Sequence, residues 1–382
     1  MDVMTDPAFR IGTFVGRVWR PDVAGPSLVV LRDGVLYDIT SRATPTMRDL
    51  LELSDPVHHA RAAPGERLLA LEEILAQEAD PARLHLIAPC DLQAVKACGV
   101  TFARSMIERV IEERAAGDAS RAEAIRARVI AVIGDSLRNL KPGSPEAARV
   151  KAALIEEGVW SQYLEVGIGP DAEVFTKAQA LSAVGPGADV GLHPASRWNN
   201  PEPEIVLAVS SSGQAKGATL GNDVNLRDIE GRSALLLGKA KDNNASCAIG
   251  PFIRLFDESY TIDDVRRAEL SLLVEGEDGY RLAGRSSMAE ISRDPLDLVA
   301  QTIGRHHQYP DGLMLFMGTL FAPVEDRDEP GQGFTHKLGD EVTIANAELG
   351  SLTNTVRLST ECVPWSFGTA ALMRNLAGRG LL

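Results

Sequence analysis

Residues 200–209 read NPEPEIVLAV and place two carboxylates at the start of a short apolar run. Side chains alternate between the two faces of a β-strand, so Glu202 and Glu204 leave the same face. Two carboxylates held close on one face repel each other unless a cation lies between them. A site built from oxygen atoms suits Mg²⁺, Mn²⁺ or Ca²⁺ and does not suit Zn²⁺. The stretch therefore predicts a metal-dependent active centre at the mouth of a strand.

Two further polar residues follow within forty residues of this stretch, each beside a predicted strand. Asp223 ends the sequence GND at residues 221–223, and Lys241 lies in the run AKDNNASCAIGP at residues 240–251. Any one of these acids alone would more readily be a surface residue at the end of a strand. Taken together with Lys241, the set indicates an active centre that holds a hard divalent cation.

The size and charge of the chain narrow the classes of protein that fit it. Its 382 residues exceed the usual size of one domain, so we expect one large catalytic domain and a smaller one. The formal net charge of −14 argues against nucleic acid or an anionic membrane surface as a partner. The expected partner is a small-molecule substrate. An anionic substrate would need a local cation, either the metal or Lys241.

The cysteine content and the lack of long apolar segments predict a cytoplasmic protein. The 4 cysteines are widely separated and form no C-x-x-C pair, which is typical of a reduced protein and not of a disulfide framework or a zinc site. The first residues are acidic and lack the apolar core of a signal peptide. The longest uncharged stretch, residues 312–324, is far too short to span a bilayer.

Hydrophobic spacing divides the chain into a small N-terminal α/β domain over residues 1–88 and a catalytic domain over residues 89–382. In the first domain, helical spacing over residues 67–77 predicts a helix. Residues 104–157 are predicted to form a helical insertion of about three helices. Beyond this insertion, many short apolar runs are broken by Gly, Pro, Asn and Asp. They predict a mainly β, mixed-sheet catalytic domain, so the expected fold class is α+β.

Several motifs together resemble those of the fumarylacetoacetate hydrolase superfamily over roughly residues 90–382. They are WNNPEPE at 198–204, GNDVNLRD at 221–228, Lys241 nine residues before Gly250-Pro251, and GDEV at 339–342. The Pro-Glu-Pro-Glu form, EVFTK at 173–177 and the ending RNLAGRGLL resemble most closely the sugar-acid branch. That branch contains 2-keto-3-deoxy-D-xylonate and D-arabinonate dehydratases. The resemblance implies mixed β-sheets rolled into a barrel-like core.

The resemblance also implies a metal site and a lysine beside it. The family's Glu-x-Glu and Asp ligands match Glu202, Glu204 and Asp223, and a fourth carboxylate of the dehydratase branch matches Glu173. Mg²⁺ is the expected cofactor, with Mn²⁺ as the alternative, and a 2-keto acid would fill its open positions. Lys241 matches the active-site lysine. Near a cation and partly desolvated, it is expected to have a lowered pKa and to act as a base at C3 or to stabilise the enolate.

The chain departs from the hydrolases of the superfamily at residues 99–108, which read GVTFARSMIE. The hydrolases have a His–Glu dyad here that activates water, whereas Ser105 stands at the position of the histidine and only Glu108 remains. Without an imidazole, the attack of water on a carbonyl loses its natural base. A dehydratase expels water and does not need that attack. We expect Glu108 to protonate the departing hydroxyl; a solvated glutamate on a charged helix is the competing interpretation.

Five residues are candidates for binding the substrate. They are Thr101, Arg104, Ser105, Lys241 and Thr335. Arg104 would bind the sugar acid, or would pair with Glu108 one helical turn away. Thr335 lies in a Gly-rich loop that by its position would close over the substrate and offer a hydrogen-bond donor.

The resemblance thus predicts a Mg²⁺-dependent lyase, which dehydrates 2-keto-3-deoxy-D-pentonate to 2,5-dioxopentanoate in pentose catabolism. The alternative on the same scaffold is a C–C bond hydrolase or decarboxylase of acylpyruvate-type 2-keto acids. A non-catalytic metabolite-binding or scaffold protein would require the carboxylate cluster to be vestigial. The resemblance further implies a homodimer or homotetramer.

Overall fold

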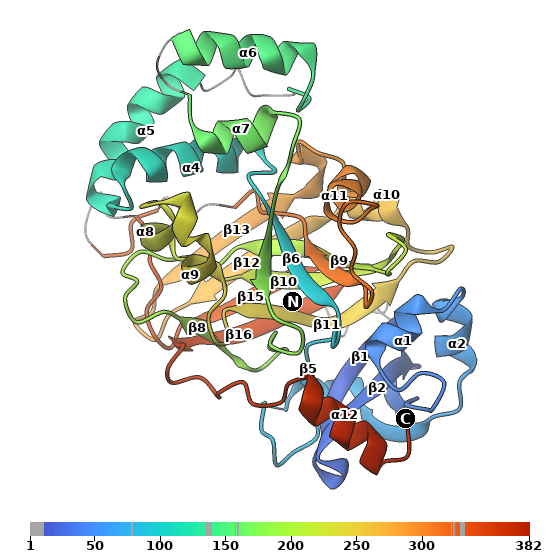
Figure 1. The fold of residues 1–382 in the computed structure, drawn as a ribbon. Coiled ribbons are helices and arrows are strands. Elements are labelled where there is room, and N and C mark those ends of the chain that lie inside the picture. Colours follow the sequence, from blue (N-terminus) through green and yellow to red (C-terminus); the bar gives the residue numbers. More distant parts are fainter. Residues whose placement is uncertain are drawn as a thin grey trace.

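The computed structural model describes residues 11–382 except 78, 134–139, 157, 159, 322, 324 and 329–332. Within the described residues, two β-sheets pack together and helices lie around them (Figure 1). None of the helices described in this way has both the length and the apolar character that crossing a bilayer requires.

The larger sheet runs through the whole molecule, in the order β4-β3-β2-β1-β11-β10-β9-β14-β6-β7, and β5 pairs with β1. Its strands are β1 (Phe14–Arg20), β2 (Gly25–Arg32), β3 (Val35–Asp38), β4 (Glu66–Ala70), β5 (His85–Ile87), β6 (Ala94–Gly99), β7 (Glu173–Ala178), β9 (Pro203–Val209), β10 (Ala215–Asp223), β11 (Cys247–Leu255) and β14 (Leu313–Phe316). Strands β9 and β11 are buried along their whole length. Both faces of the sheet are therefore covered at its centre, which explains the continuous apolar runs.

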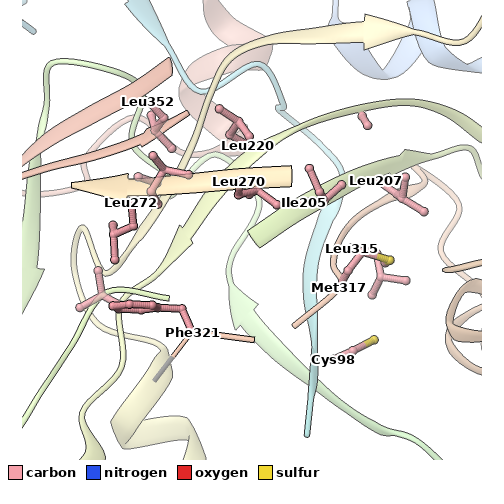
Figure 2. Packing of buried hydrophobic residues seen from close by; sticks show 14 of the residues in the cluster. Cys98, Ile205, Leu207, Leu220, Leu270, Leu272, Leu315, Met317, Phe321 and Leu352 are labelled. Carbon is pink, nitrogen blue, oxygen red and sulfur yellow. The ribbon is translucent and has the colours of Figure 1, made fainter. Parts of the chain in front are cut away.

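The smaller sheet packs against the larger one and has the order β13-β12-β15-β16-β8. Its strands are β8 (Asp189–Leu192), β12 (Glu269–Glu275), β13 (Arg281–Ser287), β15 (Glu341–Asn346) and β16 (Gly350–Leu358). Strand β12 alternates between exposed and buried residues, as expected of a strand with one covered face. Its Leu270 and Leu272 share one apolar cluster with Ile205 and Leu207 of β9 (Figure 2).

The described strands form two open sheets, and the barrel-like core that the sequence predicted is not found among them. Strand β1 continues the larger sheet from the N-terminal region, because Phe14 and Val15 pair with Arg254 and Ile253 of β11. The larger sheet therefore extends across the predicted division at residues 88 and 89, and the boundary itself stays a prediction.

Short helices accompany the N-terminal strands, namely α1 (Met47–Glu52), α2 (Pro56–Ala62) and α3 (Leu71–Leu75). The helix predicted over residues 67–77 is wrong in its first part. Residues 66–70 form β4 because they pair with β3, and this tertiary contact outweighs the helical spacing. The late helix α12 (Thr369–Gly378) returns to these strands, where Asn375 Nδ2 donates to the Val23 carbonyl at 2.7 Å (Figure 1).

The helices α4 to α7 form a helical cap over one end of the larger sheet (Figure 1). Along the chain, this cap lies between β6 and β7. The cap consists of α4 (Ala103–Ala115), α5 (Ala119–Ile133), α6 (Pro145–Glu156) and α7 (Gln162–Ile168). Met106 and Val110 of α4 pack with Leu164 of α7 in a separate apolar core. The range predicted for the helical insertion contains α5, α6 and all but the first residue of α4, and the insertion as a unit over residues 104–157 stays a prediction. The remaining helices are α8 (Arg227–Glu230), α9 (Leu237–Lys241), α10 (Ile262–Val265) and α11 (Pro295–Thr302), with 3₁₀ turns at Pro21–Val23, Ala234–Leu236 and Met288–Glu290.

Candidate active site

Three carboxylates meet where β9 and β10 run antiparallel. Glu204 is paired with Gly221, and the Asp223 N–H donates to the Glu202 carbonyl at 3.1 Å, which brings the three acids to the same end of the two strands. One oxygen from each of Glu202, Glu204 and Asp223 can be chosen so that all lie within 4.8 Å of one another, and all three residues are buried. The structure thus brings together the three acids that the Glu-x-Glu pattern and Asp223 predicted.

The electrostatics of this triad explain why it needs positive charge. Burial, and then repulsion by Asp223 and Glu202, raises the pKa of Glu204 well above its ordinary value. Attraction by Lys241, and then the Gly318 N–H, which donates to Glu204 Oε2 at 2.6 Å, partly offset this rise. Buried carboxylate oxygens at this spacing match the donors that Mg²⁺ or Mn²⁺ prefers. The residues present therefore fit a hard divalent cation.

Lys241, at the end of α9, faces the triad directly. Its Nζ donates to Glu202 Oε2 at 2.7 Å and lies 3.2 Å from Asp223 Oδ2. Burial alone would lower the pKa of Lys241, but attraction by Asp223, Glu202 and Glu230 outweighs it and raises the pKa above its ordinary value. The sequence predicted a lowered pKa from desolvation and a nearby cation; the acids around Lys241, which that prediction did not include, act in the opposite direction.

A second lysine, Lys177 on β7, lies behind the triad and is completely buried. Its Nζ is 2.8 Å from Asp223 Oδ1 and donates to the carbonyls of Lys241 at 2.7 Å and Val224 at 3.2 Å. No role was predicted for Lys177 from the sequence. A signal was present, because Lys177 is four residues after Glu173 and therefore on the same face of the strand.

Glu173 begins β7 and lines the same pocket as the triad. Burial, and then repulsion by Glu230, raises the pKa of its carboxyl to about 7. A Cβ on Gly99 would overlap the carboxylate end of Glu173, which would then have to move from its present position. The converging group of acids in the described residues contains the triad alone. Glu173 as a fourth metal ligand therefore stays a prediction.

Two residues that sequence reasoning missed complete the charged wall of the pocket. Arg109 of α4 donates from Nη2 to Glu202 Oε1 at 2.6 Å, and its Nη1 lies 3.1 Å from Glu230 Oε2 at the end of α8. No sequence pattern indicates either residue, since Arg109 meets Glu202, and Glu230 meets Arg109, only through the docking of helices on the sheet. Other lining residues are Cys98, Gly99, Val100, Ser105, Phe175, Gly318 and Thr319.

Helix α4 does not present Glu108 to the pocket. The carboxylate binds Arg126 of α5 at 2.8 and 3.1 Å and lies 3.3 Å from Arg227 of α8, and it is not among the described residues that line the pocket. Both oxygens of Glu108 are occupied by guanidinium groups. Glu108 therefore fits neither of its two expected roles, which were the acid that protonates the departing hydroxyl and a solvated surface glutamate. Ser105 does line the pocket, with its hydroxyl donating to the Phe102 carbonyl at 2.9 Å.

The other substrate-binding candidates lie in different settings. The Thr101 hydroxyl donates to the Met317 carbonyl at 2.7 Å, which fixes the segment that carries the Gly318 N–H. Thr335 accepts a hydrogen bond from the Asn199 N–H and donates one to the Arg197 carbonyl, both at 3.3 Å. Its hydroxyl therefore joins two loops of the protein to each other. Neither threonine is among the described lining residues, and a direct substrate contact by either is not supported. The side chain of Arg104 lies outside the described residues.

Comparison of the chain with known proteins identifies a matching family model and two similar proteins. Residues 165–357 match the family model described as Fumarylacetoacetate (FAA) hydrolase C-terminal, a range that contains the triad, Glu173, Lys177 and Lys241. The chain is 28% identical over 331 residues to "Probable 2-keto-3-deoxyxylonate dehydratase" of Haloferax volcanii, across 86% of this chain and 94% of that protein. It is 29% identical over 185 residues to 2-dehydro-3-deoxy-D-arabinonate dehydratase of Saccharolobus solfataricus, across 48% and 58%.

A solved structure shares the fold over nearly the whole chain. It is that of 2-keto-3-deoxy-D-arabinonate dehydratase complexed with magnesium and 2,5-dioxopentanoate. It matches with a TM-score of 0.63 at 19% identity, and the match covers 90% of this chain and 99% of that one. At this level of identity the likeness establishes the fold.

Proposed function

Because the chain belongs to the fumarylacetoacetate hydrolase family, as its motifs predicted, we propose that it dehydrates a 2-keto-3-deoxy-D-pentonate to 2,5-dioxopentanoate. The observation that carries the proposal is the meeting of three buried carboxylates and Lys241 in one pocket. The names of two relatives, and a solved neighbour that contains magnesium and 2,5-dioxopentanoate, support it.

In this proposal Glu202, Glu204 and Asp223 hold a divalent cation, Mg²⁺ or Mn²⁺. When bound, the cation would supply Lewis-acid polarisation of the 2-keto carbonyl and stabilise negative charge on its oxygen. Lys177 Nζ holds Asp223 Oδ1 at 2.8 Å, and the other carboxylate oxygen, Oδ2, lies 3.2 Å from Lys241 Nζ. The Gly318 N–H orients Glu204 in the same way.

Proton transfer in this proposal belongs to Glu173. A carboxyl with a pKa of about 7 exchanges its proton at neutral pH, so it acts as a base in one step and as an acid in the next. Removal of the C3 proton and departure of the C4 hydroxyl, as water, give an unsaturated 2-keto acid. Transfer of a C5 proton to C3 and tautomerisation of the resulting enol then yield the aldehyde. One water leaves in total, and no external oxidant is required.

Lys241 acts as an ammonium in this scheme. Its raised pKa keeps it protonated at neutral pH, so of its two expected roles the proposal retains the stabilisation of negative charge and not the base at C3. The ammonium lies 2.7 Å from Glu202 and 5.6 Å from the centre of the Phe175 ring, which fixes its position beside the triad.

The alternative reaction, hydrolysis of an acylpyruvate, lacks a water-activating base in this proposal. Ser105 occupies the place of the histidine, and Glu108 is bound to Arg126 and lies beside Arg227. Both oxygens of the Glu108 carboxylate accept hydrogen bonds from guanidinium groups and are therefore not free to hold an attacking water. The geometry therefore favours the dehydratase.

The deciding experiment is a product assay. The purified protein with 2-keto-3-deoxy-D-xylonate and Mg²⁺ is expected to form 2,5-dioxopentanoate, identified by mass spectrometry, and to lose this activity with a chelator. Full activity after removal of metal would refute the metal-dependent scheme, and cleavage of an acylpyruvate in its place would support the hydrolase. The homodimer or homotetramer stays a prediction that light scattering would test.

A further inference from the structure

Arg109 links the helical cap to one member of the carboxylate triad. Its Nη2 donates to Glu202 Oε1 at 2.6 Å, and its Nη1 donates to Glu112 Oε2 at 2.6 Å and lies 3.1 Å from Glu230 Oε2. The side chain is 12% exposed and lines the pocket. One guanidinium therefore meets three buried carboxylates, which come from the approach to β9, from α4 and from α8.

The groups that anchor this guanidinium are themselves held by buried ion pairs. Glu112 Oε1 accepts from Arg227 Nε at 2.7 Å. Arg227 also lies 3.3 Å from Glu108, whose carboxylate binds Arg126 of α5 at 2.8 Å. A continuous series of ion pairs thus runs from α5 through α4 and α8 to Glu202. The position of the last carboxylate in the series depends on how the cap is docked.

We propose that Arg109 is a positioning residue, which sets the orientation of the Glu202 carboxylate toward the divalent cation. The inference rests on the proposed function, because it takes Glu202 as a metal ligand. A planar guanidinium holds several carboxylates in fixed relative directions, whereas an ammonium is a point charge on a flexible stem. Lys241 binds the other oxygen, Glu202 Oε2, at 2.7 Å, so the two cations fix the carboxylate from both sides.

A positioning role and a purely electrostatic role predict opposite effects on metal binding. A positive charge beside the site repels Mg²⁺, so removing that charge alone would strengthen binding. Loss of the ligand's orientation weakens binding, and groups that orient metal ligands typically contribute about tenfold to hundredfold in affinity. The direction of the change therefore distinguishes the two roles.

The test is calorimetric titration of Mg²⁺ into the full chain, its Arg109→Lys and Arg109→Met variants, and Arg126→Met as a matched control. Arg126 belongs to the same series of ion pairs, and within the described residues it contacts none of the triad. We expect both Arg109 variants to bind Mg²⁺ at least about tenfold more weakly. The control is expected to change affinity by less than about threefold. Arg109→Lys keeps the charge, so the test does not depend on whether Arg109→Met folds.

Unchanged or tighter Mg²⁺ binding by the Arg109 variants would overturn this inference and leave the proposed function intact. An equal loss of affinity in Arg126→Met would also overturn it, because the effect would then come from a loosened cap. If the unaltered chain binds no Mg²⁺, the proposed metal centre fails, and the role of Arg109 fails with it.

Discussion

The ammonium of Lys177 donates a hydrogen bond to the main-chain carbonyl of Lys241 at 2.7 Å, so one buried lysine holds the backbone from which the other reaches the carboxylates. The same ammonium lies 2.8 Å from Asp223. Strand β7, the end of β10 and the end of α9 are thus joined by a single side chain. This arrangement makes the geometry of the site depend on a residue that does not line the pocket among the described residues.

Replacing Lys177 with Met is expected to lower both stability and activity. Removal of one partner from a buried ion pair costs about 3–5 kcal/mol. Of its two ammonium neighbours, Asp223 would then keep Lys241 alone. We expect the urea midpoint to fall, and kcat to fall at least about tenfold because Lys241 loses its support. Lys239→Met is the control, since Lys239 lies on α9 with Lys241 and is exposed. Equal effects of the two substitutions would contradict the role given to Lys177.

Glu204→Gln is expected to abolish turnover while the chain stays folded. The substitution removes a metal ligand and keeps the shape of the side chain, and the raised pKa of Glu204 shows that the site disfavours the charged form. We expect kcat to fall at least about a thousandfold, equivalent to several kcal/mol. In thermal melts, Mg²⁺ should raise the Tm of the unaltered chain but not that of the variant. An equal rise in both would exclude Glu204 as a ligand.

The pH dependence of stability should report on Glu173. Its pKa is raised from 4.5 to about 7 on folding, so between these values the folded chain binds more protons than the unfolded one. Stability is then lost as the pH rises through this range, on the order of 3 kcal/mol at most. Glu173→Gln removes the titrating group. Its free energy of unfolding should match the unaltered chain near pH 4.5 and exceed it at pH 8.

Denaturation with urea in the presence of a chelator would measure this difference, because metal bound to the triad would alter the charge near Glu173. The same gap between the two proteins at pH 5 and pH 8 would show that burial does not shift this carboxyl as the structure indicates.

Ser105→His is not expected to convert the protein into an acylpyruvate hydrolase. The substitution restores the imidazole of the hydrolase motif, but Glu108 remains bound to Arg126 and lies beside Arg227, and so is not free to orient the ring. We expect no acylpyruvate cleavage above background, measured by the loss of its enol absorbance. Substantial cleavage by the single variant would show that the dyad assembles in spite of these contacts.

The sequence predicted the triad because its information is local. Glu202 and Glu204 alternate on one strand, and the adjacent strand supplies Asp223. Lys177 follows from the same alternation once Glu173 is chosen, but no local pattern distinguishes a buried lysine in a strand from an exposed one. The predicted shift in the pKa of Lys241 did not include the surrounding acids. The direction of that shift depends on how many acids surround the ammonium, which no local pattern records.

Arg109 and Glu230 represent what the sequence did not reveal. Their contact with each other, and that of Arg109 with Glu202, depend on how α4 and α8 dock on the sheet. Surface charges on a helix have the same pattern whether they face solvent or a buried partner. The open sheets have a similar cause, because short apolar runs specify strands but not whether the last strand meets the first.

The pairing of β1 with β11 also constrains how the molecule is made. During translation β1 can pair early with β2 and β5, but β11, which pairs with Phe14 and Val15, is synthesised only after the cap and the ligand-bearing strands. Until then this end of β1 presents unsatisfied backbone groups, which is a hazard for misassociation with other nascent polypeptides. The carboxylate triad can form before β1 and β11 pair. The pairing of this N-terminal strand should therefore be a late step in folding.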